Sequence, residues 1–227
     1  MNVIDKIRRK WMKLRLQPIR VFCLHHVCAF FDAEVMIDGD WMQIDEFKSK
    51  VKAMQQDGVE FISLTEAYNH LKNDKIRNSK YAVISFDDGY ASLKEILPWL
   101  DEQHIPATLF INGKYLDGKS YRRNPREKYL TKAELFALTS PLIEIGSHGW
   151  EHIRAVNQTE KEFKNNVEQC RELLKKHPRY IPFFAYTWGR HNESTDKVLK
   201  EMNIVPVLIQ GTKNYSNKKY IDREFIC

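Results

Sequence analysis

Short runs of apolar and β-branched residues alternate with segments of helical periodicity along most of this 227-residue chain. Continuous short apolar runs are typical of buried strands, whereas recurrence every three or four residues is typical of helices. The alternation predicts an α/β fold in which a parallel sheet, open or closed into a barrel, is covered by helices. In both arrangements the loops after the strands form the site. The predicted strands cover 19–27, 60–64, 81–86, 107–111, 142–146, 181–185 and 205–209.

The predicted helices lie between these strands. Three of them cover 93–100, 132–138 and 194–202, and another carries Phe47, Val51 and Met54 before it ends at Gly58. The longest is expected to start at a capping box, Thr159-x-x-Glu162, because each side chain can satisfy a backbone N–H at the helix start. Its buried stripe is predicted to be Phe163, Val167, Cys170 and Leu174.

A chain of this length is suited to one domain with a single core. Its first twenty residues carry seven basic side chains and one acidic one, an excess that equals the whole net charge of +6. The remainder is therefore neutral, which argues against general nucleic-acid binding. We expect a basic segment at 1–18 followed by a single domain at 19–227.

The basic segment is expected to form an amphipathic helix. Its apolar residues follow helical spacing at Ile4, Ile7, Trp11 and Leu14, and lysine and arginine occupy the other faces. Such a helix is suited to peripheral contact of residues 1–16 with an anionic membrane surface. The alternative is a helix that packs on the domain and exposes its charges.

Several absences indicate a cytoplasmic protein, either free or associated with the cytoplasmic face of a membrane. The four cysteines show no Cys-x-x-Cys pair, which favours free thiols in a reducing compartment. The sequence contains neither a membrane-spanning apolar run nor the features of a signal peptide.

Acidic residues and histidines follow two of the predicted strands. Asp87 and Asp88 come directly after the strand at 81–86, and adjacent carboxylates repel unless a cation or a proton relieves their charge. Asp-Asp-Gly alone could also be a simple turn. His148 and His152 follow a later strand and could converge on one ion if the backbone made a helical turn. Together the two motifs indicate a site for a divalent metal.

These motifs, with a third after the strand at 181–185, resemble those of the polysaccharide deacetylases of carbohydrate esterase family 4, the NodB-homology domains. The third motif alone could equally be core packing. The three occur in the family's order, and the resemblance spans about residues 19–226. It implies the family's distorted (β/α)7-type barrel and a metal-dependent N-deacetylase. The matching segments are SFDDG at 85–89, SHGWEH at 147–152 and AYTWG at 185–189.

The resemblance implies a role for each matched residue. Asp88, His148 and His152 look like the ligands of one divalent metal ion, with zinc the first expectation and cobalt, nickel or manganese as alternatives. Asp87 looks like the general base that deprotonates the nucleophilic water. This division is chemically reasonable, because one carboxylate binds the ion while its neighbour remains able to accept a proton.

Other residues are expected to bind the substrate or to protonate the leaving amine. Tyr90, Tyr186 and Trp188 are predicted to contact the substrate, and the backbone N–H of Trp188 is expected to stabilise the oxyanion. His25 is predicted to be the general acid, because LHHV at 24–27 resembles the Tyr-His-x-Ile/Val strand of the circularly permuted branch, which deacetylates poly-N-acetylglucosamine. The alternative is a structural histidine at a strand end.

Two positions depart from the family pattern. Ala185 stands where the family has the arginine that orients the catalytic aspartate, and Thr187 stands where it has proline. Asp87 therefore has either a different partner or a less well tuned pKa.

The expected function is metal-dependent removal of the N-acetyl group from an amino sugar in a polysaccharide, an oligosaccharide or a lipid-linked glycan. One alternative with the same fold is deformylation of a lipid-linked amino sugar. Another, from a different class, is a catalytically inactive carbohydrate-binding relic. No nucleic-acid partner is expected, and the sugar, the acyl group and the oligomeric state stay open.

Overall fold

The computed structural model describes residues 18–30, 41–73, 80–117, 128–211, 213–214 and 220–226. The helix predicted at the start of the chain therefore lies outside the described residues.

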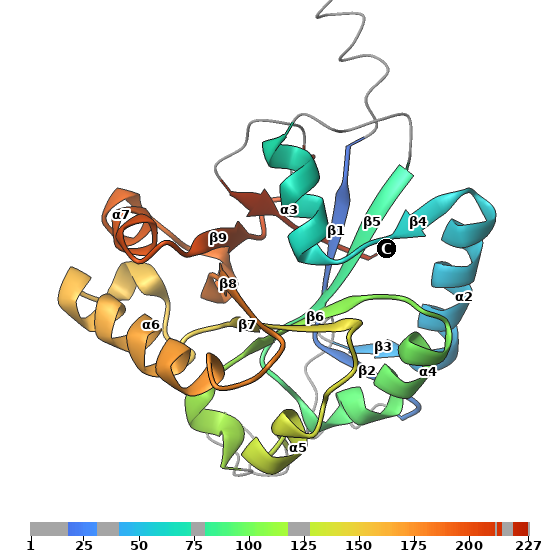
Figure 1. Cartoon of the computed structure of the whole chain (residues 1–227), viewed down its shortest axis with the longest axis horizontal. Helices are drawn as coiled ribbons and strands as arrows, with labels where there is room; N and C mark the ends of the chain where they lie inside the picture. The colour runs from blue at the N-terminus through green and yellow to red at the C-terminus, as the bar shows by residue number, and fades with distance from the viewer. Residues whose placement is uncertain are drawn as a thin grey trace, which may run out of the picture.

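A parallel sheet curves into a nearly closed barrel (Figure 1). The long strands pair in parallel with their neighbours, and β4 (Val59–Phe61) pairs with β5 beside this path. The order along the sheet is β10 (Ile221–Asp222), β9 (Val205–Leu208), β8 (Tyr180–Ala185), β7 (Ile143–Ser147), β6 (Ala107–Ile111), β5 (Lys80–Phe86), β1 (Arg20–Leu24) and β11 (Glu224–Phe225).

The first and last strands in this order, β10 and β11, belong to one short chain segment. β10 pairs with β9 and β11 pairs with β1, and Arg223 alone separates them in the sequence. The segment 221–225 thus joins the last long strand to the first. Counted as one strand position, it completes the seven positions of the predicted (β/α)7-type barrel.

Helices lie outside the barrel, with α2 (Ile44–Gln56) and α4 (Leu97–Glu102) on one side and α6 (Glu160–Leu174) and α7 (Glu193–Glu201) on the other in Figure 1. A small parallel sheet of β2 (His26–Cys28) and β3 (Trp41–Gln43) follows β1. Within the described ranges, no helix is both long enough and apolar enough to cross a bilayer. The other helices are α3 (Leu64–Lys72) and α5 (Lys132–Phe136), with short 3-10 helices η1 (Ala91–Glu95), η2 (Gly113–Leu116), η3 (Ala155–Asn157) and η4 (Thr187–Gly189).

Helix α6 agrees closely with the prediction. Thr159 accepts a hydrogen bond from the Glu162 backbone N–H, and the Glu162 carboxylate accepts one from the Thr159 N–H, which forms the predicted capping box. The predicted stripe is buried, and Asn166 is buried with it. This polar residue on an otherwise apolar face lies beside the site described below.

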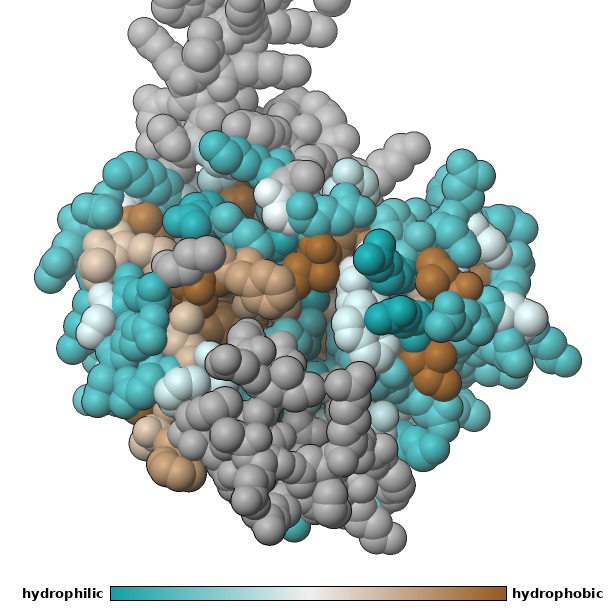
Figure 2. Space-filling model, turned by 180° about the vertical axis from the view of Figure 1, so that it is seen from behind, coloured by the Kyte–Doolittle hydropathy of each residue, from teal (hydrophilic) through white to brown (hydrophobic). Residues whose placement is uncertain are grey.

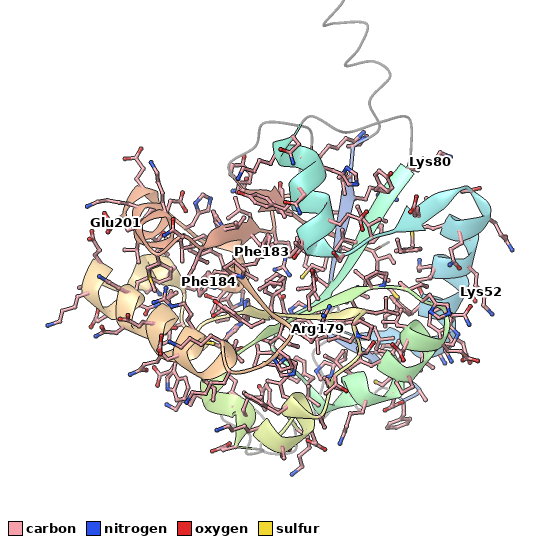
Figure 3. All side chains as sticks on the ribbon, viewed as in Figure 1. Lys52, Lys80, Arg179, Phe183, Phe184 and Glu201 are labelled. Carbon is pink, nitrogen blue, oxygen red and sulfur yellow. The ribbon has the colours of Figure 1, made fainter. Side chains whose placement is uncertain are left out.

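The strands are buried on both faces, so consecutive side chains enter different clusters of the core. Phe183 and Phe184, neighbours on β8, are labelled in Figure 3 and belong to separate clusters. Charged side chains such as Lys52 and Glu201 lie at the periphery. Where Figure 2 colours the residues, this face is mostly hydrophilic, with apolar patches between the hydrophilic side chains.

Two predicted elements are interrupted in the structure. The strand predicted at 19–27 is divided into β1 and β2, and His25 lies at the break. The helix predicted at 93–100 is divided into η1 and α4, with Pro98 in the first turn of α4, where its missing N–H costs little. The strand segment 221–225 was not predicted.

Candidate functional site

The carboxyl ends of β1, β5, β7 and β8 meet at one end of the barrel, because all four strands are parallel. His25 follows β1, and Asp87 follows β5. His148 follows β7, and Trp188 follows β8. The fold therefore brings together residues that are separated by as many as 163 positions in the sequence.

Asp88, His148 and His152 form a compact group. The Nε2 atoms of His148 and His152 lie 3.6 and 3.3 Å from Asp88 Oδ1, and one ligand atom from each residue lies within 4.8 Å of the others. Ligands at zinc-like bond lengths around a tetrahedral ion are about 3.3–3.6 Å apart. One carboxylate and two imidazoles at this spacing match the donor set of a borderline divalent cation.

His148 is oriented for such a role. Its Nδ1 lies 2.8 Å from the Ala185 carbonyl oxygen, which can only accept, so Nδ1 carries the proton and the Nε2 lone pair faces Asp88. Burial lowers the pKa of His148, although the nearby Asp87 and Asp88 carboxylates act in the opposite direction. The imidazole therefore stays neutral near pH 7, as metal ligation requires.

The spacing of the two histidines predicts that a helical turn brings them together, but residues 148–152 contain no helical turn. Residues 148–152 form an irregular loop in which Gly149 has a φ of 89°. The Gly149 and Trp150 carbonyl oxygens accept hydrogen bonds from the N–H groups of Gly113 and Lys114. A left-handed glycine and backbone pairing with η2 thus replace the helical turn.

A sharp turn after β5 separates the two aspartates. Asp88 has a φ of 70° and Gly89 a φ of 79°. A non-glycine residue in this region costs of order 1–3 kcal/mol, and such strain is concentrated at functional sites. The turn directs the Asp88 carboxylate toward the histidines, whereas Asp87 reaches a different partner.

That partner is Arg223, which was not identified from the sequence. Its Nη1 and Nη2 atoms donate to Asp87 Oδ1 and Oδ2 at 2.6 and 2.7 Å. Its Nε also donates to the Leu208 carbonyl oxygen at 3.2 Å, and the guanidinium is completely buried. Asp87 therefore does have an arginine partner. This partner is Arg223 of the segment that closes the barrel, whereas the position of the family arginine is occupied by Ala185.

The electrostatics of the pair keep Asp87 ionised. Burial alone would raise the pKa of Asp87, but the Arg223 guanidinium, with smaller contributions from His148 and His25, holds it well below its usual value. Burial likewise tends to lower the pKa of Arg223, and the Asp87 carboxylate more than offsets this. Asp87 is therefore a carboxylate at neutral pH, the form that can accept a proton.

His25 lies beside Asp87. One potential ligand atom from each of Cys23, His25 and Asp87 lies within 4.8 Å of the others, and Cys23 Sγ donates to Asp87 Oδ2 at 3.5 Å. Burial raises the pKa of the Cys23 thiol well above its usual value, so the thiol stays protonated. Because Arg223 also binds both Asp87 oxygens, this second group is a poorer metal site than the first.

The three residues predicted to contact substrate differ in exposure. Trp188 is 51% exposed, its ring centroid is 4.2 Å from that of His152, and the Arg154 guanidinium lies over its face. Trp188 therefore presents its indole ring beside the metal-ligand group.

Tyr90 and Tyr186, in contrast, are almost completely buried. Tyr186 donates from its hydroxyl to Asp196 at 2.9 Å and packs against Phe163, while Tyr90 stacks on His26 at 3.8 Å. Their accessible surface is therefore small in this structure, and contact of these two side chains with the substrate stays a prediction.

Known proteins share sequence and fold with this chain. A family model described as polysaccharide deacetylase matches residues 74–207, more than half of the chain. YxkH of Bacillus subtilis (strain 168), whose name describes it as a polysaccharide deacetylase, is 25% identical over 158 residues, which are 69% of this chain and 54% of YxkH. The chain thus spans about half the length of this curated relative.

Two solved structures share the fold. IcaB from Ammonifex degensii superposes with a TM-score of 0.77 at 19% identity, covering 93% of this chain and 92% of IcaB. The Streptococcus pyogenes deacetylase PplD, solved with acetate, gives a TM-score of 0.80 at 18% identity, covering 93% of each chain. With the family match and the ordered motifs, these findings establish that the chain belongs to the polysaccharide deacetylase family.

Proposed function

We propose that this protein is a metal-dependent carbohydrate N-deacetylase, which hydrolyses the N-acetyl group of an amino sugar. The observation that carries the proposal is the spacing of Asp88, His148 and His152, whose ligand atoms lie within 4.8 Å of one another beside an ionised Asp87. A relic that only binds carbohydrate has no need for a buried, ionised carboxylate next to such a group. Membership of the polysaccharide deacetylase family supports the same reaction class.

The three ligands fit a divalent cation by donor type, spacing and protonation state, with zinc the first candidate. When bound, such a cation would supply Lewis acidity, which polarises the amide carbonyl and acidifies water. Cobalt, nickel and manganese accept the same ligands.

Asp87 is proposed to be the general base. Its Oδ2 lies 3.9 Å from His148 Nε2, so it reaches the space next to the metal ligands where a water molecule would react. Asp87 takes a proton from this water as the oxygen attacks the acetamide carbonyl carbon. Arg223 holds the carboxylate in one orientation with both oxygens engaged, which favours a defined direction of proton transfer.

His25 and Trp188 are proposed to complete the reaction. The Trp188 N–H donates to the oxyanion of the tetrahedral intermediate. His25, close to Asp87, then gives a proton to the amide nitrogen as the carbon–nitrogen bond breaks. The products are acetate and the free amine of the sugar, and the proton that Asp87 took from water replaces the one that His25 gave.

The proposal predicts acetate release that depends on a bound metal. Acetate is measured with chito-oligomers, acetylated sugar nucleotides and polyprenyl-linked sugars as substrates. Activity should disappear after chelation and return with zinc or cobalt, because the cation would supply the Lewis acidity that the reaction needs. Binding of metal without acetate release from any substrate would favour the relic. Formate release from N-formyl sugars alone would favour the deformylase.

We further propose that residues 1–16 bring the enzyme to an anionic membrane surface on the cytoplasmic side, where a lipid-linked substrate would be available. The support is the basic amphipathic pattern of that segment. Deletion of residues 1–16 should abolish sedimentation with anionic liposomes and leave hydrolysis of a soluble acetylated sugar intact. Zwitterionic liposomes are the control, and equal binding by the deletion variant would contradict the proposal.

A further inference from the structure

The loop that carries both histidine ligands is held from helix α6 by the side chain of Asn166. Asn166 Oδ1 accepts a hydrogen bond from the Trp150 N–H at 2.7 Å, and its Nδ2 donates to the Glu151 carbonyl oxygen at 3.4 Å. These two peptide groups lie between His148 and His152 in the sequence. A single amide therefore contacts the backbone that sets the separation of the two imidazoles.

The fit around this amide is tight. Asn166 is only 8% exposed, and a Cβ on Gly149 would come within 2.6 Å of its Oδ1. On the other side, the loop pairs with η2 through Gly113 and Lys114. The irregular loop is thus held between two elements. At this point α6 contacts it through the Asn166 side chain, which both donates and accepts, and through the Asn166 backbone carbonyl oxygen, which accepts from the Trp150 N–H at 3.2 Å.

We propose that Asn166 is a positioning residue that pre-organises His148 and His152 for the cation, an inference that rests on the proposed metal-dependent function. His148 has its own anchor in the Ala185 carbonyl oxygen. The path of the chain onward to His152 instead depends on the peptides of Trp150 and Glu151, which Asn166 binds. An irregular loop has no repeating hydrogen bonds of its own, so the side-chain contacts of Asn166 add to the few backbone bonds that hold the chain before His152.

Replacement of Asn166 by Ala should weaken metal binding by about 10–100-fold, the usual effect of losing a residue that orients a ligand. The measurement is titration of the metal-free full-length protein with Co²⁺, followed by the visible absorption of the bound ion. A matched control is Asn165→Ala. Asn165 is the same residue type at the preceding position of α6, but it is exposed, so its replacement should leave both the Co²⁺ affinity and the spectrum unchanged.

Thermal unfolding of the metal-free proteins separates this role from a merely structural one. A structural role would lower the unfolding temperature of Asn166→Ala but leave the Co²⁺ affinity of the folded protein within twofold of wild type, which would overturn the inference. If Asn166→Ala does not fold, Asn166→Gln serves, since it keeps the amide but moves it by one methylene. It should lose about tenfold in affinity. Failure of the wild type to bind Co²⁺ would instead contradict the proposed function itself.

Discussion

Asp87→Asn is expected to lower acetate release by roughly 10²–10⁴-fold, the usual contribution of a general base. Asparagine is nearly the same shape but cannot accept the proton that the carboxylate takes from water. Because Asp87 is held by Arg223 and not by the metal-ligand group, Co²⁺ should still bind. The measurement is the rate constant for acetate release by the metal-loaded protein, together with its Co²⁺ affinity.

The substitution also leaves the Arg223 guanidinium buried without a counter-charge, which costs about 3–5 kcal/mol of stability. Rates are therefore compared at a temperature where circular dichroism shows both proteins folded. Asp45→Asn removes an exposed carboxylate at the start of α2 and is the control for a simple change of charge. Acetate release by Asp87→Asn within tenfold of wild type would exclude Asp87 as the base.

Arg223→Met is expected to destabilise the fold by about 3–5 kcal/mol and to slow acetate release, because it leaves the Asp87 carboxylate buried and unpaired. Burial would then dominate and raise the pKa of Asp87, so the carboxylate form would appear only at higher pH. The acidic limb of the pH–rate profile should therefore move to higher pH. Urea unfolding and acetate release as a function of pH provide the two measurements.

In the wild type, the Asp87–Arg223 pair makes the fold more stable at neutral pH than at acidic pH. The pKa of Asp87 in the folded protein lies below its usual value, so its pairing with Arg223 stabilises the fold at neutral pH. This contribution is lost only as the pH falls below about 4, through the folded-state pKa. In Arg223→Met this acid-sensitive contribution should be absent from the unfolding curve.

Arg20→Met is the matched control for Arg223→Met. Arg20 pairs with Glu224 at the same junction of β1 and β11, but both side chains are more than a third exposed. Its loss should cost about 0–1 kcal/mol and leave the pH–rate profile unchanged. Equal effects of the two substitutions would mean that Arg223 only helps to close the barrel.

Much of the fold followed from patterns between neighbouring residues. The alternation of strands and helices, and the capping box and buried stripe of α6, depend on side chains a few positions apart. The first two motifs also indicated which residues would gather at the strand ends. Parallel strands place their carboxyl ends together, so short sequences that follow different strands must meet.

Features that depend on contacts distant in the sequence could not be predicted in this way. β10 and β11 are two residues long each, too short to show a strand period. The burial of Tyr90 and Tyr186 depends on which neighbours the barrel packs against them. The loop from His148 to His152 contacts α6 through Asn166, and the predicted buried stripe of α6 did not include this residue.

The sequence alone therefore determined the α/β alternation and indicated the candidate ligands Asp88, His148 and His152, because strand and helix periods and short motifs are each visible within a few consecutive residues. Only the tertiary structure decided how Asp87 is held. Arg223 lies 136 positions away and reaches it because the segment 221–225 closes the barrel beside β1. Helical and strand periods arise from local backbone geometry, whereas a buried ion pair exists only after the chain has closed around it.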